Sequence, residues 1–248
     1  MTVSRTEEAR KRIILALDVD EYDHAIQLVE RFSDHIEIFK VGMELYGAAG
    51  PRIVKAIHRR KKKVFLDLKF HDIPTTVAKA GIVAAREGVF MFNVHASGGL
   101  DMMRRCSEEV VKVCLKENLA KPRIIAVTVL TSMGQEQLRA EIGIQHSLKT
   151  HVRHLAGLAL KAGLDGVVSS AEEAASIRRH CGSGFLIVTP GIRPAWAAAD
   201  DQQRIMTPRQ ALREGSDFLV MGRAILRHPD PVRAVEMTAR EISGREHD

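Results

Sequence analysis

Short apolar runs alternate with longer amphipathic segments along almost the whole chain. The apolar runs are rich in Ile, Val, Leu and Phe and have the length of strands that are buried on both faces. Eight strands are predicted: Arg12–Asp18, Ile36–Val41, Lys63–Lys69, Val89–His95, Arg123–Leu130, Asp165–Ser169, Phe185–Thr189 and Asp217–Met221. Helical spacing predicts helices between them at Tyr22–Arg31, Pro51–Arg60, Thr75–Glu87, Asp101–Glu117, Lys149–Ala162, Ala171–Arg179 and Pro208–Glu214.

This alternation of strand and helix indicates a parallel sheet with helices on its outer face. Eight units in 248 residues favour an α/β protein with a closed (β/α)₈ TIM barrel. A doubly wound open sheet is the alternative, but the GxGxxG sequence of such folds is absent after the first strand. No linker or repeat divides the chain, so we expect a single domain over 1–248, with tails at 1–10 and 242–248.

Composition and charge restrict the class of protein further. Hydrophobic residues make up 45% and charged residues 27%, as in a soluble globular domain. The formal net charge of +6 suits either a nucleic-acid partner or the steering of a small polyanion into a pocket. The one tight basic run, 59–63, ends a predicted helix and is typical of a solvated face that complements the helix dipole. We therefore expect no nucleic-acid partner.

The cysteines and the N-terminal segment predict the compartment. Cys106, Cys114 and Cys181 form no CxxC pair and cannot all be bridged, which favours a reducing environment. The N-terminal segment is charged and lacks the apolar core of a signal peptide. No stretch approaches the roughly 18 apolar residues of a membrane span. We expect a cytoplasmic protein with no membrane association.

Charged residues occur where barrel strands should be apolar. Because side chains alternate between the two faces of a strand, Asp67 and Lys69 share the face of Phe65 and should point into the barrel mouth. The same count places Asp18 at the end of the first strand and Lys40 at the end of the second. Barrel active sites lie at the carboxyl ends of the strands, so these positions predict an active site. The alternative is a structural ion-pair network that closes the barrel top.

Asp72, in the loop after the third strand, extends this array of charges. Buried charges must pair with one another. A lysine held between carboxylates keeps its ammonium form, and it can then stabilise and protonate a developing carbanion. The carboxylates in turn repel another anion, such as a departing carboxylate. The array therefore predicts chemistry through a carbanion.

A phosphate site is predicted at the loops after the seventh and eighth strands. Gly191 and Gly222 each follow a strand, where backbone N–H groups and a helix start can receive a phosphate. Arg223 opens the next helix and could hold a phosphate through paired hydrogen bonds. The alternative for this Gly-Arg pair is a helix cap followed by a solvated side chain.

Several longer motifs occur in one order along the chain. They are LALD at Leu15–Asp18, FKVGMELY at Phe39–Tyr46, FLDLKFHDIPTTV at Phe65–Val77, NVHASGG at Asn93–Gly99, LTS at Leu130–Ser132, TPGIRP at Thr189–Pro194, DQQRIMTP at Asp201–Pro208 and MGRAI at Met221–Ile225. In this order they resemble the bacterial form of orotidine 5′-phosphate decarboxylase from Arg12 to Ile225. DxKxxD is shared with sugar-phosphate relatives, whereas DxKFHDIPxT with GIRP and the late Gln and Arg is far more specific.

The resemblance implies a role for each matching residue. Lys69 would donate a proton to C6 of the pyrimidine, Asp67 would lie by the substrate carboxylate, and Lys40 and Asp72 would complete the catalytic array. The substrate-binding residues that it implies are Asp18 and Lys40 at the ribose, Thr131 at the pyrimidine edge, Gln202, Gly222 and Arg223 at the phosphate with Arg193 near them, and Ile73 and Thr76.

The resemblance also implies a homodimer in which Asp72, Ile73 and Thr76 reach the neighbouring subunit's site. It implies decarboxylation of orotidine 5′-monophosphate in de novo pyrimidine biosynthesis, with no metal and no organic cofactor. The nearest alternative is a Mg²⁺-dependent keto-sugar-phosphate decarboxylase of the same wider group. Another is a catalytically silent phosphate-sensing or RNA-binding barrel, which has no reason to retain four charges in its mouth.

Three further residues near the predicted site invite interpretation. His71 and His95 lack the HxH or HExxH spacing of a metal site, so we favour structural hydrogen bonding over catalysis for both. Trp196 lies in the loop that the resemblance expects to fold over the substrate. It either packs on the closed loop or covers surface, and the sequence leaves both open.

Overall fold

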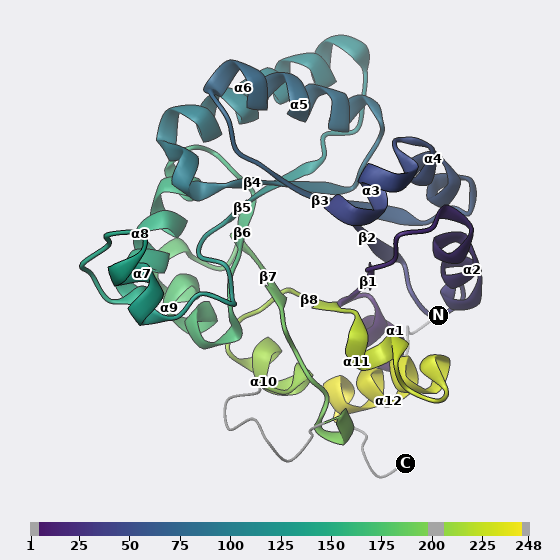
Figure 1. The fold of residues 1–248 in the computed structure, drawn as a ribbon. Helices are drawn as coiled ribbons and strands as arrows, with labels where there is room; N and C mark the ends of the chain where they lie inside the picture. The colour runs from purple at the N-terminus through teal and green to yellow at the C-terminus, as the bar shows by residue number, and fades with distance from the viewer. Residues whose placement is uncertain (1–4, 198–205, 245–248) are drawn as a thin grey trace.

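The computed structural model describes residues 5–197 and 206–244. Eight parallel strands pair in chain order, and the last returns to the first to close a barrel, seen along its axis in Figure 1. The strands are β1 Ile13–Leu17, β2 Ile38–Gly42, β3 Lys63–Phe70, β4 Met91–His95, β5 Arg123–Val127, β6 Gly166–Val168, β7 Leu186–Pro190 and β8 Phe218–Met221. The predicted TIM barrel is confirmed, and each strand overlaps its predicted range.

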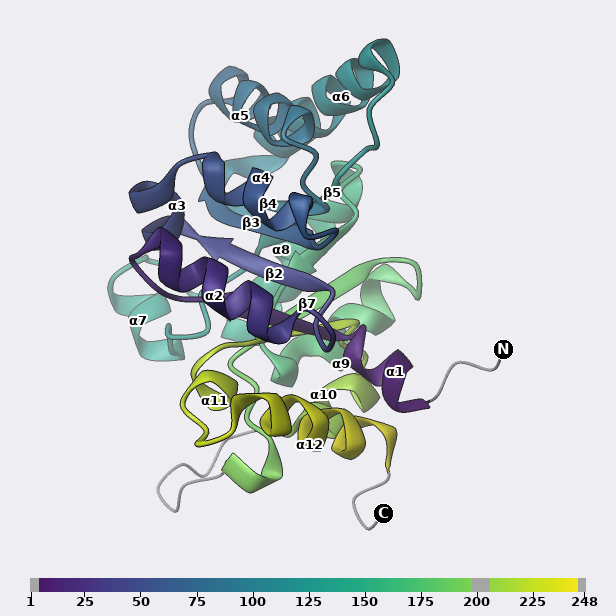
Figure 2. The same cartoon turned by 90° about the vertical axis from the view of Figure 1, so that its right-hand side faces the viewer.

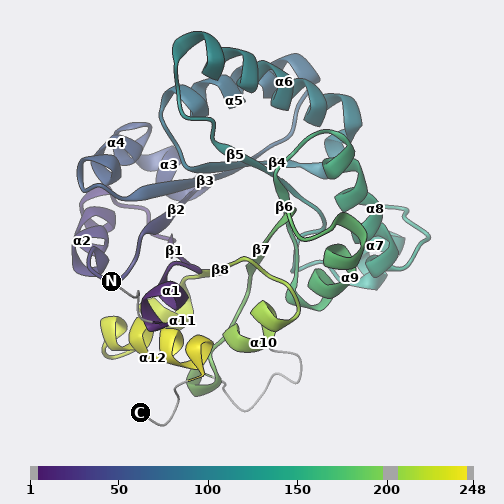
Figure 3. The same cartoon turned by 180° about the vertical axis from the view of Figure 1, so that it is seen from behind.

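The helices form a ring outside the barrel wall (Figures 1 and 3). They are α1 Arg5–Arg10, α2 Tyr22–Phe32, α3 Met43–Ala49, α4 Arg52–Arg59, α5 Pro74–Arg86, α6 Gly99–Glu117, α7 Gln135–Ala140, α8 Leu148–Lys161, α9 Ala171–Cys181, α10 Pro208–Arg213, α11 Arg223–Leu226 and α12 Pro231–Ser243, with 3₁₀ turns η1 Ala96–Gly98 and η2 Ala195–Ala197. All seven predicted helices are present, with small shifts at their ends. In the described ranges, no helix is long and apolar enough to cross a membrane.

Two of the late helices begin at clear sequence signals. Thr207 caps α10, where its side chain accepts from the backbone N–H of Gln210 and the Gln210 side chain accepts in return from the Thr207 N–H. Asp230 caps α12 by accepting from the backbone N–H of Arg233 at 3.1 Å. Each helix then starts with proline, whose fixed φ suits the first turn.

The expected tails are wrong for residues 5–10 and 242–243. Residues 5–10 form α1, in which Ala9 is buried and Arg10 Nη2 lies 2.7 Å from Glu236 Oε2 on α12. The amphipathic segment is ordered because it covers α12, a contact between the two ends of the chain that the local sequence does not reveal. Residues 242 and 243 belong to α12. In Figure 2, α1 and the last turn of α12 lie at one end of the barrel, and α3 and α7 at the other.

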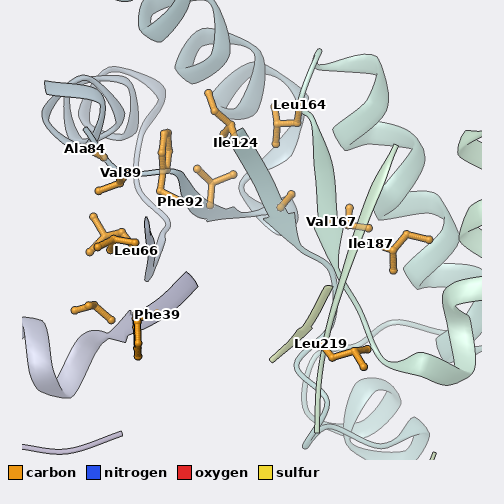
Figure 4. Close-up of a cluster of buried hydrophobic side chains, with 14 of the residues drawn as sticks. Phe39, Leu66, Ala84, Val89, Phe92, Ile124, Leu164, Val167, Ile187 and Leu219 are labelled. Carbon is orange, nitrogen blue, oxygen red and sulfur yellow. The ribbon is translucent and has the colours of Figure 1, made fainter. Parts of the chain in front are cut away.

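Two hydrophobic clusters fill the molecule. The larger lies between the barrel wall and the helices, and Figure 4 shows its strand residues, such as Phe39, Leu66 and Phe92, on the helix-facing side. The smaller fills the barrel with Ile14, Ala16, Ile38, Phe65, Met91, Ile125, Val188, Phe218 and Val220. These residues occupy alternate strand positions, as the predicted faces require.

The amino-terminal end of the barrel is closed by aromatic rings. Phe90 and Phe218 meet edge to face with ring centroids 6.3 Å apart, and the guanidinium of Arg123 lies 4.7 Å from the Phe90 centroid. The ion pairs of Lys40 and Lys69 lie at the opposite, carboxyl-terminal end.

Three residues of the basic run 59–63 are paired with neighbouring segments of the chain. Arg60 donates to Glu30 through Nε at 3.2 Å, and Lys62 donates to the backbone carbonyl of Ser33. Lys63 lies 2.6 Å from Glu37. These contacts join the end of α4 and the start of β3 to α2 and to the residues just before β2.

Candidate active site

A row of alternating charges crosses the carboxyl ends of β1, β2 and β3. The ammonium of Lys40 donates to Asp18 Oδ1 at 3.0 Å and lies 3.4 Å from Asp67 Oδ2. The ammonium of Lys69 donates to Asp67 Oδ1 at 2.8 Å. The structure thus brings these four predicted residues together. Lys40 is the lysine held between two carboxylates, whereas the ammonium of Lys69 pairs with Asp67 alone among the carboxylates of residues 5–197 and 206–244.

Burial divides the row into a protected and an open part. The side chains of Lys40 and Asp67 are 10% and 13% exposed, whereas that of Asp18 is 53% exposed. Burial alone would raise the pKa of Asp67. The charges of Lys40 and Lys69, with hydrogen bonds from Lys69 and Asn93, outweigh burial and hold this pKa below its ordinary value. Asp67 is therefore a carboxylate at neutral pH.

The end of β3 departs from regular strand geometry. Leu66 pairs with Phe92, and the next pair is Phe70 with Val94, so residues 67–69 of β3 stand opposite the single residue Asn93. Lys69 has a left-handed backbone with φ of 51°, a conformation that is uncommon outside glycine. The alternation of faces accounts for Phe65 and Asp67, but the position of Lys69 is set by this bulge.

Asn93 joins the two catalytic candidates on β3. Its Nδ2 donates to Asp67 Oδ1 at 2.6 Å, and its Oδ1 accepts from the backbone N–H of Lys69 at 2.8 Å. The residue is 1% exposed. The sequence analysis did not predict a role for Asn93. Its position offered a signal, because an amide two residues after the inward-facing Met91 shares the inward face of an otherwise apolar strand.

A cavity of about 680 Å³ opens beside this row. Five predicted residues line it, namely Asp18, Lys40, Arg193, Gly222 and Arg223. Arg227, one helical turn after Arg223, lines it too and was not predicted. Three guanidinium groups around one cavity suit a polyanionic ligand, because each can make paired hydrogen bonds to phosphate oxygens.

Two glycines lie where this cavity approaches the backbone. A Cβ added to Gly222 would lie 3.2 Å from Asp18 Oδ2 and 3.3 Å from the Cβ of Ala16. Gly191 has a φ of 76° at the turn after β7, which L side chains rarely adopt. The turn after β7 therefore favours glycine through its backbone angle, and a side chain at Gly222 would press on Asp18 and Ala16.

Other predicted residues lie apart from the row within one chain. Thr131 lines a second cavity of about 480 Å³, which shares residues 190–192 with the first. Asp72 is exposed and accepts from the backbone N–H of Ile73, a residue that is itself 67% exposed. Thr76 is exposed in the first turn of α5. Gln202 lies outside the described residues.

His71 and His95 contact each other beside the charged row. Their ring centroids are 5.4 Å apart with planes inclined by 33°. Burial lowers the pKa of His95, and the neighbouring His71 and Lys69 lower it further. We expected structural hydrogen bonds for these two rings. Within the described part of the chain neither ring makes one, and the two rings contact each other instead.

Trp196 is partly buried in the loop after β7. Its ring meets that of His228 edge to face with centroids 5.1 Å apart, and it packs against the larger hydrophobic cluster. The rest of the loop on which the sequence allowed Trp196 to pack, residues 198–205, lies outside the described residues. Across residues 5–197 and 206–244, no group of three or more His, Cys, Asp or Glu side chains is placed to hold a metal ion.

Comparison with known proteins gives a consistent family. A family profile described as "Orotidine 5′-phosphate decarboxylase / HUMPS family" matches residues 11–238. The chain is 53% identical over 228 residues to the orotidine 5′-phosphate decarboxylase of Syntrophomonas wolfei, covering 92% of this chain and 95% of that protein. It is 52% identical over 231 residues to the enzyme of that name from Legionella pneumophila, covering 93% of this chain and 99% of that protein.

Solved structures agree with these relatives. The crystal structure of orotidine 5′-phosphate decarboxylase from Lactobacillus acidophilus is similar with a TM-score of 0.82 and 34% identity, covering 94% of this chain and 99% of that one. An uncharacterised conserved protein from Geobacillus kaustophilus is similar with a TM-score of 0.81 and 40% identity, covering 93% and 99%. The similarity therefore spans the whole barrel.

Proposed function

This chain belongs to the orotidine 5′-phosphate decarboxylase / HUMPS family, and from that premise we propose that it converts orotidine 5′-monophosphate to uridine 5′-monophosphate and carbon dioxide. The observation that carries the proposal is the row Asp18–Lys40–Asp67–Lys69 beside an arginine-lined cavity. The arginine-lined end of this site suits a phosphate. The charged row suits a carboxylate whose loss leaves a carbanion on the ring carbon. The substrate has both groups.

The chemical step proceeds through a carbanion at C6. The bond between C6 and the carboxylate carbon breaks, carbon dioxide leaves, and the electron pair remains on C6 in the plane of the ring. The ammonium of Lys69 stabilises this charge and then donates its proton to C6, which leaves a neutral amine to be reprotonated from solvent. Asp67, which stays ionised, orients Lys69 and repels the substrate carboxylate.

The phosphate supplies binding energy far from the reacting carbon. Arg193, Arg223 and the backbone of Gly222 would hold it, while Asp18 and Lys40 bind ribose hydroxyls. Loss of this carboxylate is slow without an enzyme because the carbanion cannot delocalise. A barrier reduction of up to about 23 kcal/mol is then needed, and preorganised charge with remote phosphate binding is the expected source.

The active form is a homodimer with shared sites. Asp72, Ile73 and Thr76 follow β3 on the exposed side of the row, and Asp72 has no ion pair among the described residues of its own chain. An exposed carboxylate next to an exposed isoleucine suits a surface that a second subunit covers. Asp72 would then join the row of the neighbouring subunit.

The reaction belongs to de novo pyrimidine biosynthesis, and we place the enzyme in the cytoplasm. Cys106, Cys114 and Cys181 are unpaired thiols, which suits a reducing compartment. The roles of Thr131 and Gln202 at the pyrimidine edge and the phosphate rest on the motif positions alone.

Loss of substrate absorbance, measured with purified protein in EDTA, tests the function. Rapid turnover that Lys69→Ala abolishes supports the proposed reaction and the role of the lysine. In D₂O the product should carry deuterium at C6. No turnover of orotidine 5′-monophosphate by folded protein would contradict the proposal. The Mg²⁺-dependent sugar-phosphate alternative would instead lose activity in EDTA and regain it with added metal.

A further inference from the structure

At the bulge near the end of β3, a side chain of β4 takes the place of a backbone hydrogen-bond partner. Between the pairs Leu66–Phe92 and Phe70–Val94, three residues of β3 face one residue of β4. The parallel ladder is interrupted there, so the N–H of Lys69 cannot pair with a backbone carbonyl of β4 in the regular way. The Oδ1 of Asn93 accepts this N–H at 2.8 Å. Asn93 thus replaces a missing ladder bond.

The other end of the same amide holds the carboxylate of Asp67. Nδ2 of Asn93 donates to Asp67 Oδ1 at 2.6 Å, and the ammonium of Lys69 donates to the same oxygen at 2.8 Å. With Oδ1 occupied by two donors, Oδ2 is the oxygen that lies 3.4 Å from Lys40. One neutral side chain therefore sets both the left-handed backbone of Lys69 and the rotation of the Asp67 carboxylate.

We propose that Asn93 is a positioning residue that holds Lys69 and Asp67 in the geometry required for the proton transfer to C6. It acts through these two residues and needs no contact with substrate. The uncharged amide of Asn93 combines an acceptor for the Lys69 N–H with a donor to Asp67 and needs no titrating proton to do so. An apolar residue offers neither group, and an ionised carboxylate would repel Asp67. This inference rests on the proposed decarboxylation.

Asn93→Leu keeps the branched shape and the number of heavy atoms of the side chain and removes both hydrogen bonds. We expect kcat to fall about 10²-fold, because a misplacement of the order of 1 Å in a reacting group costs that much. KM should change only a few-fold, since the phosphate cavity is built from β1, β2 and the loops after β7 and β8. Thr238→Val, which removes a buried hydrogen bond to Ala234 in α12, is the matched control and should lower the melting temperature without changing kcat.

Asn93→Asp tests the hydrogen bond to Asp67 separately from the hydrogen bond to the Lys69 N–H. The introduced carboxyl still accepts from the Lys69 N–H, but it can donate to Asp67 only when it carries a proton. The ratio of variant to wild-type kcat should therefore rise as the pH falls from about 8 to about 5, as two adjacent carboxyls come to share one proton. A residue that merely fills the barrel would give a ratio independent of pH.

The outcomes separate this inference from the proposed function. Wild-type protein that does not turn over orotidine 5′-monophosphate contradicts the function itself. Active wild type with a folded Asn93→Leu protein whose kcat is within about threefold of it overturns the positioning role. If Asn93→Leu does not fold, Asn93→Asp decides, and a flat ratio across the pH range overturns the role equally.

Discussion

The ammonium of Lys69 lies 2.8 Å from the carboxylate of Asp67, two residues earlier on the same strand, while the backbone of Lys69 takes a φ of 51°. The two groups are thus locked together at the point where β3 leaves its regular pairing. The position of the Lys69 ammonium therefore depends on the Asp67 carboxylate and on the backbone of the β3 bulge. Charge preorganised in this way stabilises a developing anion without rearrangement during the reaction.

The stability of the protein should depend on pH through Asp67. Asp67→Asn leaves Lys40 and Lys69 without their shared carboxylate, and we expect the free energy of unfolding at pH 7 to fall by about 3 kcal/mol. Because the pKa of Asp67 is depressed in the folded protein, its stabilising contribution is present above the ordinary carboxyl pKa of about 4 and is lost as the pH falls through the depressed value. The gap between wild type and variant should be constant from pH 7 to about 5 and shrink below about 4.

Urea unfolding of both proteins across this pH range measures the gap. Glu108→Gln, which changes an exposed carboxylate of α6, is the control and should differ little from wild type throughout. A gap that stayed constant or widened in acid would show that Asp67 is not the ionised partner of the two lysines.

Arg223 should contribute most of the binding energy for the phosphate. Removing a guanidinium that makes paired hydrogen bonds costs about 3 kcal/mol, so Arg223→Ala should lower kcat/KM by roughly 10²-fold or more. Free phosphite should restore part of the activity toward the phosphate-free nucleoside in wild type. Arg213→Ala, at the exposed end of α10, is the control for loss of a positive charge. An unchanged kcat/KM in Arg223→Ala would place the phosphate elsewhere.

Mixed dimers test the shared site. Lys69→Ala and Asp72→Ala homodimers should each be nearly inactive. After unfolding and refolding together in equal amounts, half of the dimers are mixed and each has one intact site, so about one quarter of wild-type activity should return. The assay is substrate turnover, with each variant refolded alone as the control. Activity that does not rise above that of the separate variants would mean that Asp72 acts within its own subunit.

Gly222→Ala tests the close approach between β8 and β1. The added Cβ would lie 3.2 Å from Asp18 Oδ2, so the carboxylate that accepts from Lys40 must shift slightly. We expect KM to rise several-fold, with a loss of stability of about 1 kcal/mol from overpacking. Gly184→Ala, where an added Cβ meets nothing within 4 Å, should leave both quantities unchanged. Equal effects of the two substitutions would rule out a specific role for this contact.

The barrel fold and the positions of its inward-facing charges could be predicted from local sequence patterns. Alternation of apolar strands with amphipathic helices predicted all eight strands in order, and the inward faces of β1, β2 and β3 followed from a period of two. Asp18, Lys40 and Asp67 meet as expected because all three lie at carboxyl ends of adjacent parallel strands. These are local properties, carried by spacing within single segments.

Tertiary structure decided the contacts between segments that are distant in the chain. The bulge of β3, the double role of Asn93 and the separation of Thr131 from the main cavity depend on the register between strands. The order of residues 5–10 depends on α12, which lies more than 200 residues away in sequence. Sequence periodicity determined which face each side chain takes, whereas its partner across that face depends on packing and register, which no local pattern records.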